Sequence, residues 1–198
     1  MITKEFIAHR VNTIEELNSL PKEFGVELDL RDENGRVIIA HDPFIDGEKF
    51  EDYLKYYNHG TMILNIKSER IEHKVLDLIN KYQVRRYFFL DSSIPMVIKL
   101  SDEGEFNIAV RFSEYEPIES VLALKNRVKW VWVDCFSKLP IDYVSFKKLK
   151  DEGFNLCLVS PELQGRVEDI EIYKSYLQKN NICFEAICTK VTNVSKWR

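Results

Sequence analysis

The sequence predicts an α/β protein with the architecture of a compact (β/α)8 TIM barrel. Two observations lead to this prediction. Eight short apolar runs with strand character alternate with helical stretches, and regular alternation is typical of parallel strands joined by crossover helices. Polar and charged residues collect at the carboxyl ends of these runs, where a barrel carries its functional groups. About 250 residues is typical for this fold, so a chain of 198 residues should have short helices and loops.

The predicted strands follow one another along the whole chain. They cover residues 5–9, 26–31, 62–67, 87–92, 106–112, 128–134, 154–160 and 183–189. Helical stretches are expected within residues 13–20, 47–57, 68–83, 94–104, 116–126, 141–153 and 167–180. The longest of these places Ile71, Val75, Leu78 and Ile79 on one face, as an amphipathic helix does.

A hairpin extends the second predicted strand, because the turn ENGR separates it from the apolar run VIIAH. An open, doubly wound sheet is the alternative architecture. It is disfavoured because no glycine-rich phosphate-binding loop follows the first strand. The length favours one domain over residues 1–198, and the sequence contains no linker and no repeat.

The amino-acid composition limits the classes of function that this protein can have. The chain is 45% hydrophobic and 30% charged, with a net charge of −4, which argues against nucleic acid as the main partner. No apolar run approaches the roughly 20 residues that span a bilayer, and we see no signal peptide at the N-terminus. The four cysteines lack the spacing of a zinc site. We expect buried, free thiols in a cytoplasmic protein.

The second strand raises the main functional question. In GVELDLR, Val26, Leu28 and Leu30 alternate with polar residues, so Glu27 and Asp29 lie side by side on one face. Two adjacent carboxylates repel each other and call for a cation. Ordinary salt bridges with Arg10, Arg31 or Lys67 are one interpretation, but two carboxylates on an inner face favour a site for a hard divalent cation.

The other strand ends supply further candidates. His9 and His41 flank the carboxylate pair in the sequence, which favours a catalytic pairing over a structural role for either histidine. Asn65 and Lys67 share one face at the end of the third strand. Arg111 and Arg166 follow the fifth and seventh strands and are candidates for substrate binding, with salt bridges in the barrel mouth as the alternative. His59 and His73 are expected at the surface.

Three motifs together resemble the glycerophosphodiester phosphodiesterase family, and more broadly the phospholipase-C-like phosphodiesterase barrels. They are FIAHR at 6–10, GVELDLR at 25–31 and IIAHDPF at 38–44. The family pattern is HRG near the first strand, E-x-D on the second and HD after a short hairpin. The third-strand pattern, E-x-K, falls on NIK at 65–67. The strong matches cover roughly the first third of the chain.

The resemblance implies a TIM barrel that hydrolyses a phosphodiester with the help of Mg²⁺ or Ca²⁺. It implies that Glu27 and Asp29 are metal ligands, that His9 and His41 act as general acid and base, and that Arg10 and Lys67 hold the phosphate. In relatives the nucleophile can be a neighbouring hydroxyl of the substrate. Two positions depart from the pattern: Val11 replaces a glycine, and Asn65 stands at the third metal-ligand position, where Glu is usual.

The residues leave three functional hypotheses. The leading one is metal-dependent hydrolysis of a small or glycerol-containing phosphodiester. The second is a barrel that has lost turnover and binds a phosphorylated ligand, which the neutral Asn65 favours and the two histidines disfavour. The third is an aldolase or isomerase barrel with Lys67 as a Schiff-base amine, which the histidines and the acidic pair disfavour. The leaving group, the metal and the oligomeric state stay open.

Overall fold

A parallel barrel of eight strands forms the centre of the molecule. The computed structural model describes residues 2–198. The barrel strands are β1 (Thr3–Ala8), β2 (Gly25–Glu33), β5 (Met62–Ile66), β6 (Tyr87–Leu90), β7 (Ala109–Phe112), β8 (Trp130–Val133), β9 (Asn155–Val159) and β10 (Phe184–Thr189). Neighbours pair in parallel, with β1 between β10 and β2 and with β5 joining β2 to β6. The predicted fold class is confirmed.

The barrel closes between β6 and β7 through a short contact. Phe89 and Ile108 form an isolated parallel bridge, and the Phe89 amide donates to the Asn107 carbonyl at 2.8 Å. The other strand pairs are longer, for example five residue pairs between β2 and β5. The seam between β6 and β7 is therefore the weakest junction of the barrel wall.

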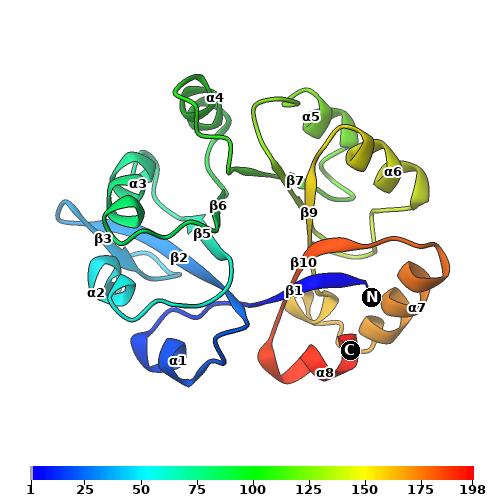
Figure 1. The fold of residues 1–198 in the computed structure, drawn as a ribbon, viewed down its shortest axis with the longest axis horizontal. Helices are drawn as coiled ribbons and strands as arrows, with labels where there is room; N and C mark the ends of the chain where they lie inside the picture. The colour runs from blue at the N-terminus through cyan, green and yellow to red at the C-terminus, as the bar shows by residue number, and fades with distance from the viewer. Residues whose placement is uncertain (1) are drawn as a thin grey trace.

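Short helices surround the strands, as the small chain length predicts (Figure 1). They are α1 (Ile14–Ser19), α2 (Phe50–Leu54), α3 (Glu72–Lys81), α4 (Ile94–Asp102), α5 (Ile118–Leu122), α6 (Tyr143–Asp151), α7 (Asp169–Lys179) and α8 (Val194–Trp197). Two 3₁₀ turns, η1 (Pro161–Gln164) and η2 (Val191–Asn193), follow β9 and β10. A helix thus separates each barrel strand from the next barrel strand along the chain. Within residues 2–198, none of these helices has the length and apolarity that a membrane crossing needs.

Local sequence explains where the first helix starts. Thr13 accepts a hydrogen bond from the Glu16 amide, and the Glu16 side chain accepts one from the Thr13 amide. This reciprocal capping box satisfies amides that a helix end leaves free. Only four residues separate the end of β1 from Thr13, so α1 begins close to the barrel mouth.

The predicted hairpin is present. β3 (Arg36–Ile39) pairs antiparallel with β2, and β4 (Glu48–Lys49) pairs with β3. Asn34 and Gly35 form the two-residue turn, with φ of 48° and 77°. Positive φ at both positions is the reason that Asn-Gly suits this tight connection. The hairpin carries the chain from β2 back toward the barrel mouth, where His41 follows β3.

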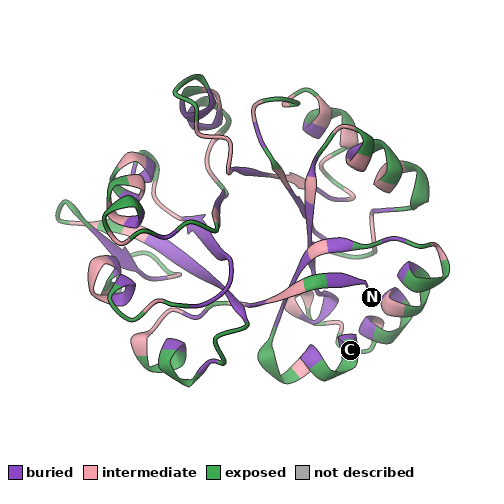
Figure 2. Ribbon diagram, in the orientation of Figure 1, coloured by how far each residue is buried: buried purple, intermediate pink, exposed green. Residues whose placement is uncertain are grey.

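Two apolar layers stabilise the fold, one between strands and helices and one inside the barrel. Figure 2 shows the buried positions along the strands and on the inward helix faces. The interior is filled by Ile7, Ile63, Phe88, Leu90, Ala109, Trp132, Cys157, Val159, Ala186 and Cys188. Phe88 stacks on Trp130 with ring centroids 4.4 Å apart. The barrel is therefore a packed core, and polar chemistry is confined to its ends.

Several details differ from the sequence prediction. β1 begins and ends earlier than the predicted 5–9, and the stretch predicted as helix from residue 47 begins with β4. His59, expected at the surface, is buried because its loop packs under α1, where its Nε2 lies 3.2 Å from the Leu20 carbonyl. Cys183, expected to be buried, is exposed because it precedes β10, while the other three thiols are free and buried.

Candidate active site

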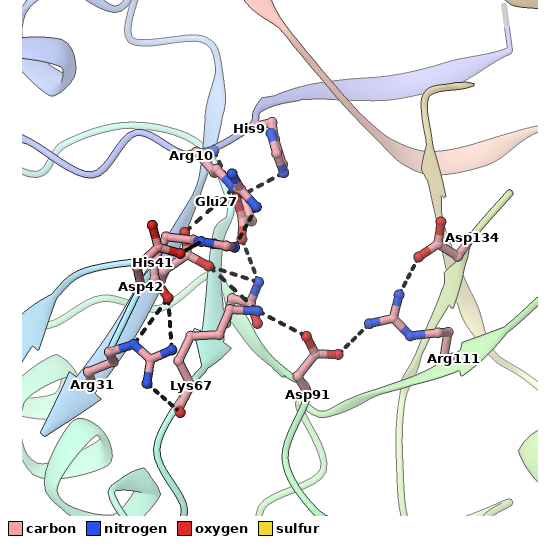
Figure 3. Close-up of polar contacts among 12 residues, drawn as sticks. His9, Arg10, Glu27, Arg31, His41, Asp42, Lys67, Asp91, Arg111 and Asp134 are labelled. Carbon is pink, nitrogen blue, oxygen red and sulfur yellow. Dashed lines mark hydrogen bonds and ion pairs between the residues drawn. The ribbon is translucent and has the colours of Figure 1, made fainter. Parts of the chain in front are cut away.

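The polar residues predicted at the ends of β1, β2 and β5 converge at one side of the barrel mouth. The strand register explains why. Ala8 pairs with Val26, and Asp29 pairs with Asn65, so the residues that follow these pairs meet at the same edge. We call this group the histidine side. It consists of His9, Arg10, Glu27, Asp29, His41, Asn65 and Lys67. Figure 3 labels five of them, His9, Arg10, Glu27, His41 and Lys67.

The carboxylates of Glu27 and Asp29 are almost fully buried, at 1% and 0% exposure. Each carboxylate oxygen accepts one hydrogen bond. Glu27 receives the Arg10 amide and the Asn65 side-chain amide, both at 2.8 Å. Asp29 receives the Asn65 amide at 3.2 Å and the Asn12 amide at 2.9 Å. Burial, and then the negative charge of Asp29, raise the pKa of Glu27 to about 7.

Asn65 bridges the two carboxylates. Its Nδ2 donates to both, while its Oδ1 is buried and has no hydrogen-bond partner. A buried amide oxygen without a partner is unfavourable by roughly 1–3 kcal/mol. The residue therefore has one unused ligand atom within the acidic pair's immediate surroundings.

His9 and Arg10 approach the pair from the end of β1. The His9 Nε2 lies 3.8 Å from Glu27 Oε2, and Arg10 Nε lies 3.9 Å from Asp29 Oδ2. Burial, and then the neighbouring Arg10 charge, lower the pKa of His9 to about 4. His9 is therefore neutral at pH 7, and its imidazole can accept a proton. The backbone of Arg10 has φ of 54°, an uncommon value for a residue with a side chain.

His41 reaches the site from the hairpin. Its Nδ1 lies 2.8 Å from Asp42 Oδ1, and its Nε2 contacts the Arg10 guanidinium. The hydrogen bond between Nδ1 and the Asp42 carboxylate orients the ring so that Nε2 faces the site. Arg31 donates to the His41 carbonyl and to the Lys67 carbonyl. It therefore ties the hairpin to β5 and does not pair with the acidic residues.

Lys67 and Arg111 are linked across the mouth by a carboxylate. Lys67 Nζ lies 3.7 Å from Asp29 Oδ1 and 3.2 Å from Asp91 Oδ2. Arg111 contacts the other Asp91 oxygen and Asp134. Figure 3 shows the resulting chain from Lys67 through Asp91 and Arg111 to Asp134. We call Asp91, Arg111, Glu116 and Asp134 the arginine side; Glu116 Oε1 lies 3.6 Å from Arg111 Nε.

Arg166, a predicted substrate-binding residue, is engaged elsewhere. Its guanidinium pairs with Asp169 at 2.8 Å and donates to the backbone carbonyls of Cys135 and Phe136. It also donates to the Tyr173 hydroxyl at 3.1 Å. These contacts fasten η1 and α7 to the loop after β8. Arg166 therefore has the contacts of a structural residue, whereas the other predicted site residues meet at the mouth.

The donor set fits a hard divalent cation with few protein ligands. Two buried carboxylates provide charge, and the partnerless Asn65 Oδ1 is a third oxygen of the type that Mg²⁺ and Ca²⁺ prefer. Within residues 2–198, however, no cluster of three or more His, Cys, Asp or Glu side chains could hold a metal ion. A cation held by Glu27, Asp29 and Asn65 would therefore have only two charged protein ligands, which leaves its coordination incomplete.

Asn12 is a site residue that the sequence did not single out. Its side-chain Nδ2 donates to Asp29 Oδ2, and its side-chain Oδ1 accepts a hydrogen bond from the Asp29 backbone amide at 3.0 Å. It thereby fixes both the side chain and the backbone of Asp29. Its position directly before the Thr13 cap was the available signal, because the cap holds this short loop against β2.

The fold and the site define a (β/α)8 barrel with buried acids, histidines and cations grouped at the carboxyl ends of its first strands. In sequence, no protein-family model and no curated protein matches the chain. In structure, the chain shares the fold of glycerophosphodiester phosphodiesterases. The enzyme of that name from Agrobacterium tumefaciens superposes with a TM-score of 0.69 at 13% identity, over 93% of this chain and 95% of the other.

A second solved structure gives the same result. A glycerophosphoryl diester phosphodiesterase from Parabacteroides distasonis has a TM-score of 0.66 at 11% identity. The match covers 98% of this chain and 85% of that one. At such low identities the likeness establishes the fold alone.

Proposed function

We propose that this protein is a metal-dependent phosphodiesterase that hydrolyses a small or glycerol-containing phosphodiester by two-histidine acid and base catalysis. The observation that carries the proposal is the meeting of His9, His41, Arg10 and Lys67 around the buried carboxylates Glu27 and Asp29. The fold shared with glycerophosphodiester phosphodiesterases supports the same reaction class. Each group has a defined task in this reaction.

The cations of the site bind and orient the phosphate. Arg10 and Lys67 stand on either side of Asp29, and both side chains retain partial exposure to solvent. A phosphodiester anion resists attack until its charge is neutralised, which preorganised cations achieve. A divalent cation held by Glu27, Asp29 and Asn65 supplies Lewis-acid stabilisation of the phosphoryl oxygens when it is bound.

The two histidines move the protons. His9 is neutral at pH 7 and accepts a proton from the nucleophile, a water molecule or a hydroxyl of the substrate. The nucleophile forms a new bond to phosphorus, and the bond from phosphorus to the leaving oxygen breaks. His41, oriented by Asp42, donates a proton to that leaving oxygen. The leaving alcohol is thus released neutral, and the phosphate product stays with the cations.

The alternative, a catalytically degenerate barrel that binds a phosphorylated ligand, rests on Asn65. A neutral amide in place of a third carboxylate weakens the attraction for a cation. The same side-chain cluster can hold a phosphate without cleaving it. A Schiff-base function for Lys67 has less support, because the ion pairs with Asp29 and Asp91 suit a phosphate-binding cation.

The proposal also covers partners and location. The net charge of −4 supports a small-molecule substrate and argues against nucleic acid. Free cysteines support a cytoplasmic location, where thiols stay reduced.

A panel of phosphodiesters, assayed with Mg²⁺, Mn²⁺ or Ca²⁺ and with a chelated control, tests the proposal. We expect cation-dependent cleavage of at least one glycerol-containing diester. In parallel, thermal melts should show cation stabilisation of the wild type, because a ligand of the native state raises its stability. The double change Glu27→Ala and Asp29→Ala should remove that shift. Cleavage of no diester by a folded, cation-binding wild type would favour the binding-only alternative.

A further inference from the structure

The acidic pair at the barrel mouth is already partnered on every oxygen. Glu27 and Asp29 accept hydrogen bonds from the Arg10 amide, the Asn12 amide and the Asn65 amide. Each carboxylate oxygen can accept a second bond or contact a cation. Each carboxylate oxygen of the site thus has one hydrogen bond from the protein, while Asn65 Oδ1 has none.

Positive charge is also close to the pair. Lys67 Nζ lies 3.7 Å and Arg10 Nε 3.9 Å from opposite oxygens of Asp29. A divalent cation bound to the buried carboxylates of Glu27 and Asp29 would lie at short range from these two partly exposed side chains, and like charges at short range repel each other. Lys67 and Arg10 already place two positive charges beside Asp29, so a divalent cation that enters without an anion would add to the positive charge at this point.

The binding of a phosphate is opposed by the negative charges of the site. The cations that would bind it, Lys67 and Arg10, face Asp29, and Lys67 also faces Asp91. An anion entering without a metal would be placed beside two buried carboxylates. Each ligand therefore removes the charge that opposes the other, and the pair is accommodated better than either ligand by itself.

We propose that Asn65 makes cation binding at Glu27 and Asp29 depend on a bound phosphate group. This inference rests on the proposed function and concerns how its site is assembled. A carboxylate at position 65 would supply the third negative charge that a cation needs to bind unaided. The neutral Asn65 instead donates its amide to both acids and leaves Oδ1 without a partner. The phosphate supplies the missing negative charge.

Thermodynamic linkage turns this arrangement into a measurable quantity. If phosphate raises the affinity for the cation by some factor, the cation must raise the affinity for phosphate by the same factor. Typical coupling between two sites lies at about 5–150-fold. Because Lys67 Nζ and Arg10 Nε lie 3.7 Å and 3.9 Å from Asp29, we expect a coupling of at least about tenfold, which lies within that range.

Titration of the whole chain with Mn²⁺ tests the inference, with free Mn²⁺ followed by electron paramagnetic resonance. The titration is performed with and without saturating sn-glycerol 3-phosphate, and the protein-free titration is subtracted. We expect the Kd for Mn²⁺ to fall at least tenfold with the phosphate. A reciprocal titration of the phosphate should show the same factor. Equal Mn²⁺ affinity in both conditions, or no Mn²⁺ binding in either, overturns the proposal.

The variant Asn65→Asp sharpens the test. It should bind Mn²⁺ without phosphate at least tenfold more tightly than the wild type, and the coupling factor should shrink. Asn58→Asp is the matched control, since it makes the same charge change at an exposed loop position and should leave both values unchanged. If Asn65→Asp fails to fold, the wild-type titrations decide alone. Unchanged coupling in a folded Asn65→Asp overturns the assignment to Asn65.

The result separates this inference from the proposed function. Coupled binding without cleavage of any diester keeps the inference and contradicts catalysis. Cleavage supported by a cation that binds independently of phosphate keeps the catalytic proposal and overturns the inference.

Discussion

The two sides of the barrel mouth carry similar residues and differ in how their charges are matched. On the arginine side, Arg111 faces Asp91, Asp134 and Glu116, and Asp134 also accepts hydrogen bonds from the Cys135 amide and the Gln164 side chain. On the histidine side, two carboxylates are buried next to each other, and burial together with Asp29 raises the pKa of Glu27 to about 7. The charges of the arginine side are therefore paired and stabilise the fold, whereas the two adjacent carboxylates of the histidine side repel each other.

This difference locates the chemistry. Perturbed titrations of buried groups concentrate at functional sites, because a site that binds and reacts needs charges its own side chains do not fully satisfy. On the histidine side both His9 and Glu27 titrate far from their ordinary pKa values. The comparison implies that mutations on the two sides change stability in opposite directions.

The largest effect is expected on the arginine side. Arg111→Ala leaves the Asp134 carboxylate, whose side chain is 3% exposed, without its cation. Breaking a buried pair in this way destabilises by about 3–5 kcal/mol. Urea denaturation of the variant measures the loss. Arg127→Ala, which removes an exposed pair with Asp102, is the control and should change stability by less than about 1 kcal/mol. Equal small losses for both would show that the arginine side is not stabilising.

A stability gain is expected on the histidine side. Glu27→Gln removes one of two adjacent buried charges, and its side-chain oxygen can still accept the hydrogen bond of the Arg10 amide or of the Asn65 amide. At pH 8 without metal we expect stabilisation of roughly 1–3 kcal/mol, together with loss of cation binding. Urea denaturation in the presence of a chelator measures the gain. A marked loss of stability would mean that Glu27 is held in place by favourable partners.

The sequence could predict most of the histidine side for physical reasons. Strict alternation in β2 places Glu27 and Asp29 on the inner face whatever the surrounding loops do, and the ends of parallel strands meet at one edge. The fold class follows from the same periodicity. These features depend on local pattern, which a single sequence displays directly.

Other features depend on contacts between distant segments. Asn12 gains its role from the path of a short loop across β2, and Arg166 is fixed by carbonyls of the loop after β8. The burial of His59 likewise follows from how its loop packs against Leu20. These contacts join residues that are far apart in the sequence and produce no periodic pattern along the chain. The sequence alone could therefore not predict them.

A smaller effect is expected on the pH dependence of metal-free stability and of cation affinity. Because the pKa of Glu27 is raised above its ordinary value of 4.5 to about 7, its contribution to metal-free stability is present below about pH 4.5 and is lost as pH rises through about 7. A cation binds the deprotonated form, so its affinity should rise by up to about tenfold per pH unit below pH 7. Melts with Mn²⁺ and sn-glycerol 3-phosphate from pH 6 to 8 should show a growing shift.

Glu27→Gln provides the control for this pH dependence. Its melting temperature relative to wild type, measured without metal, should increase between pH 5 and pH 8, because the variant lacks the group that loses its proton. A difference that is constant over this range would contradict the raised pKa of Glu27.

The central claim is that the histidine side cleaves phosphodiesters with His9 as a proton acceptor. The most direct measurement is the rate of product release from a glycerol-containing diester, with Mn²⁺ or Mg²⁺, for the wild type and for His9→Ala. His73→Ala is the control, because His73 lies on α3 and pairs with the exposed Glu103. We expect cation-dependent turnover by the wild type and the control, and a loss of about 10²–10⁴-fold in His9→Ala. Turnover by a folded His9→Ala at the wild-type rate would contradict the account.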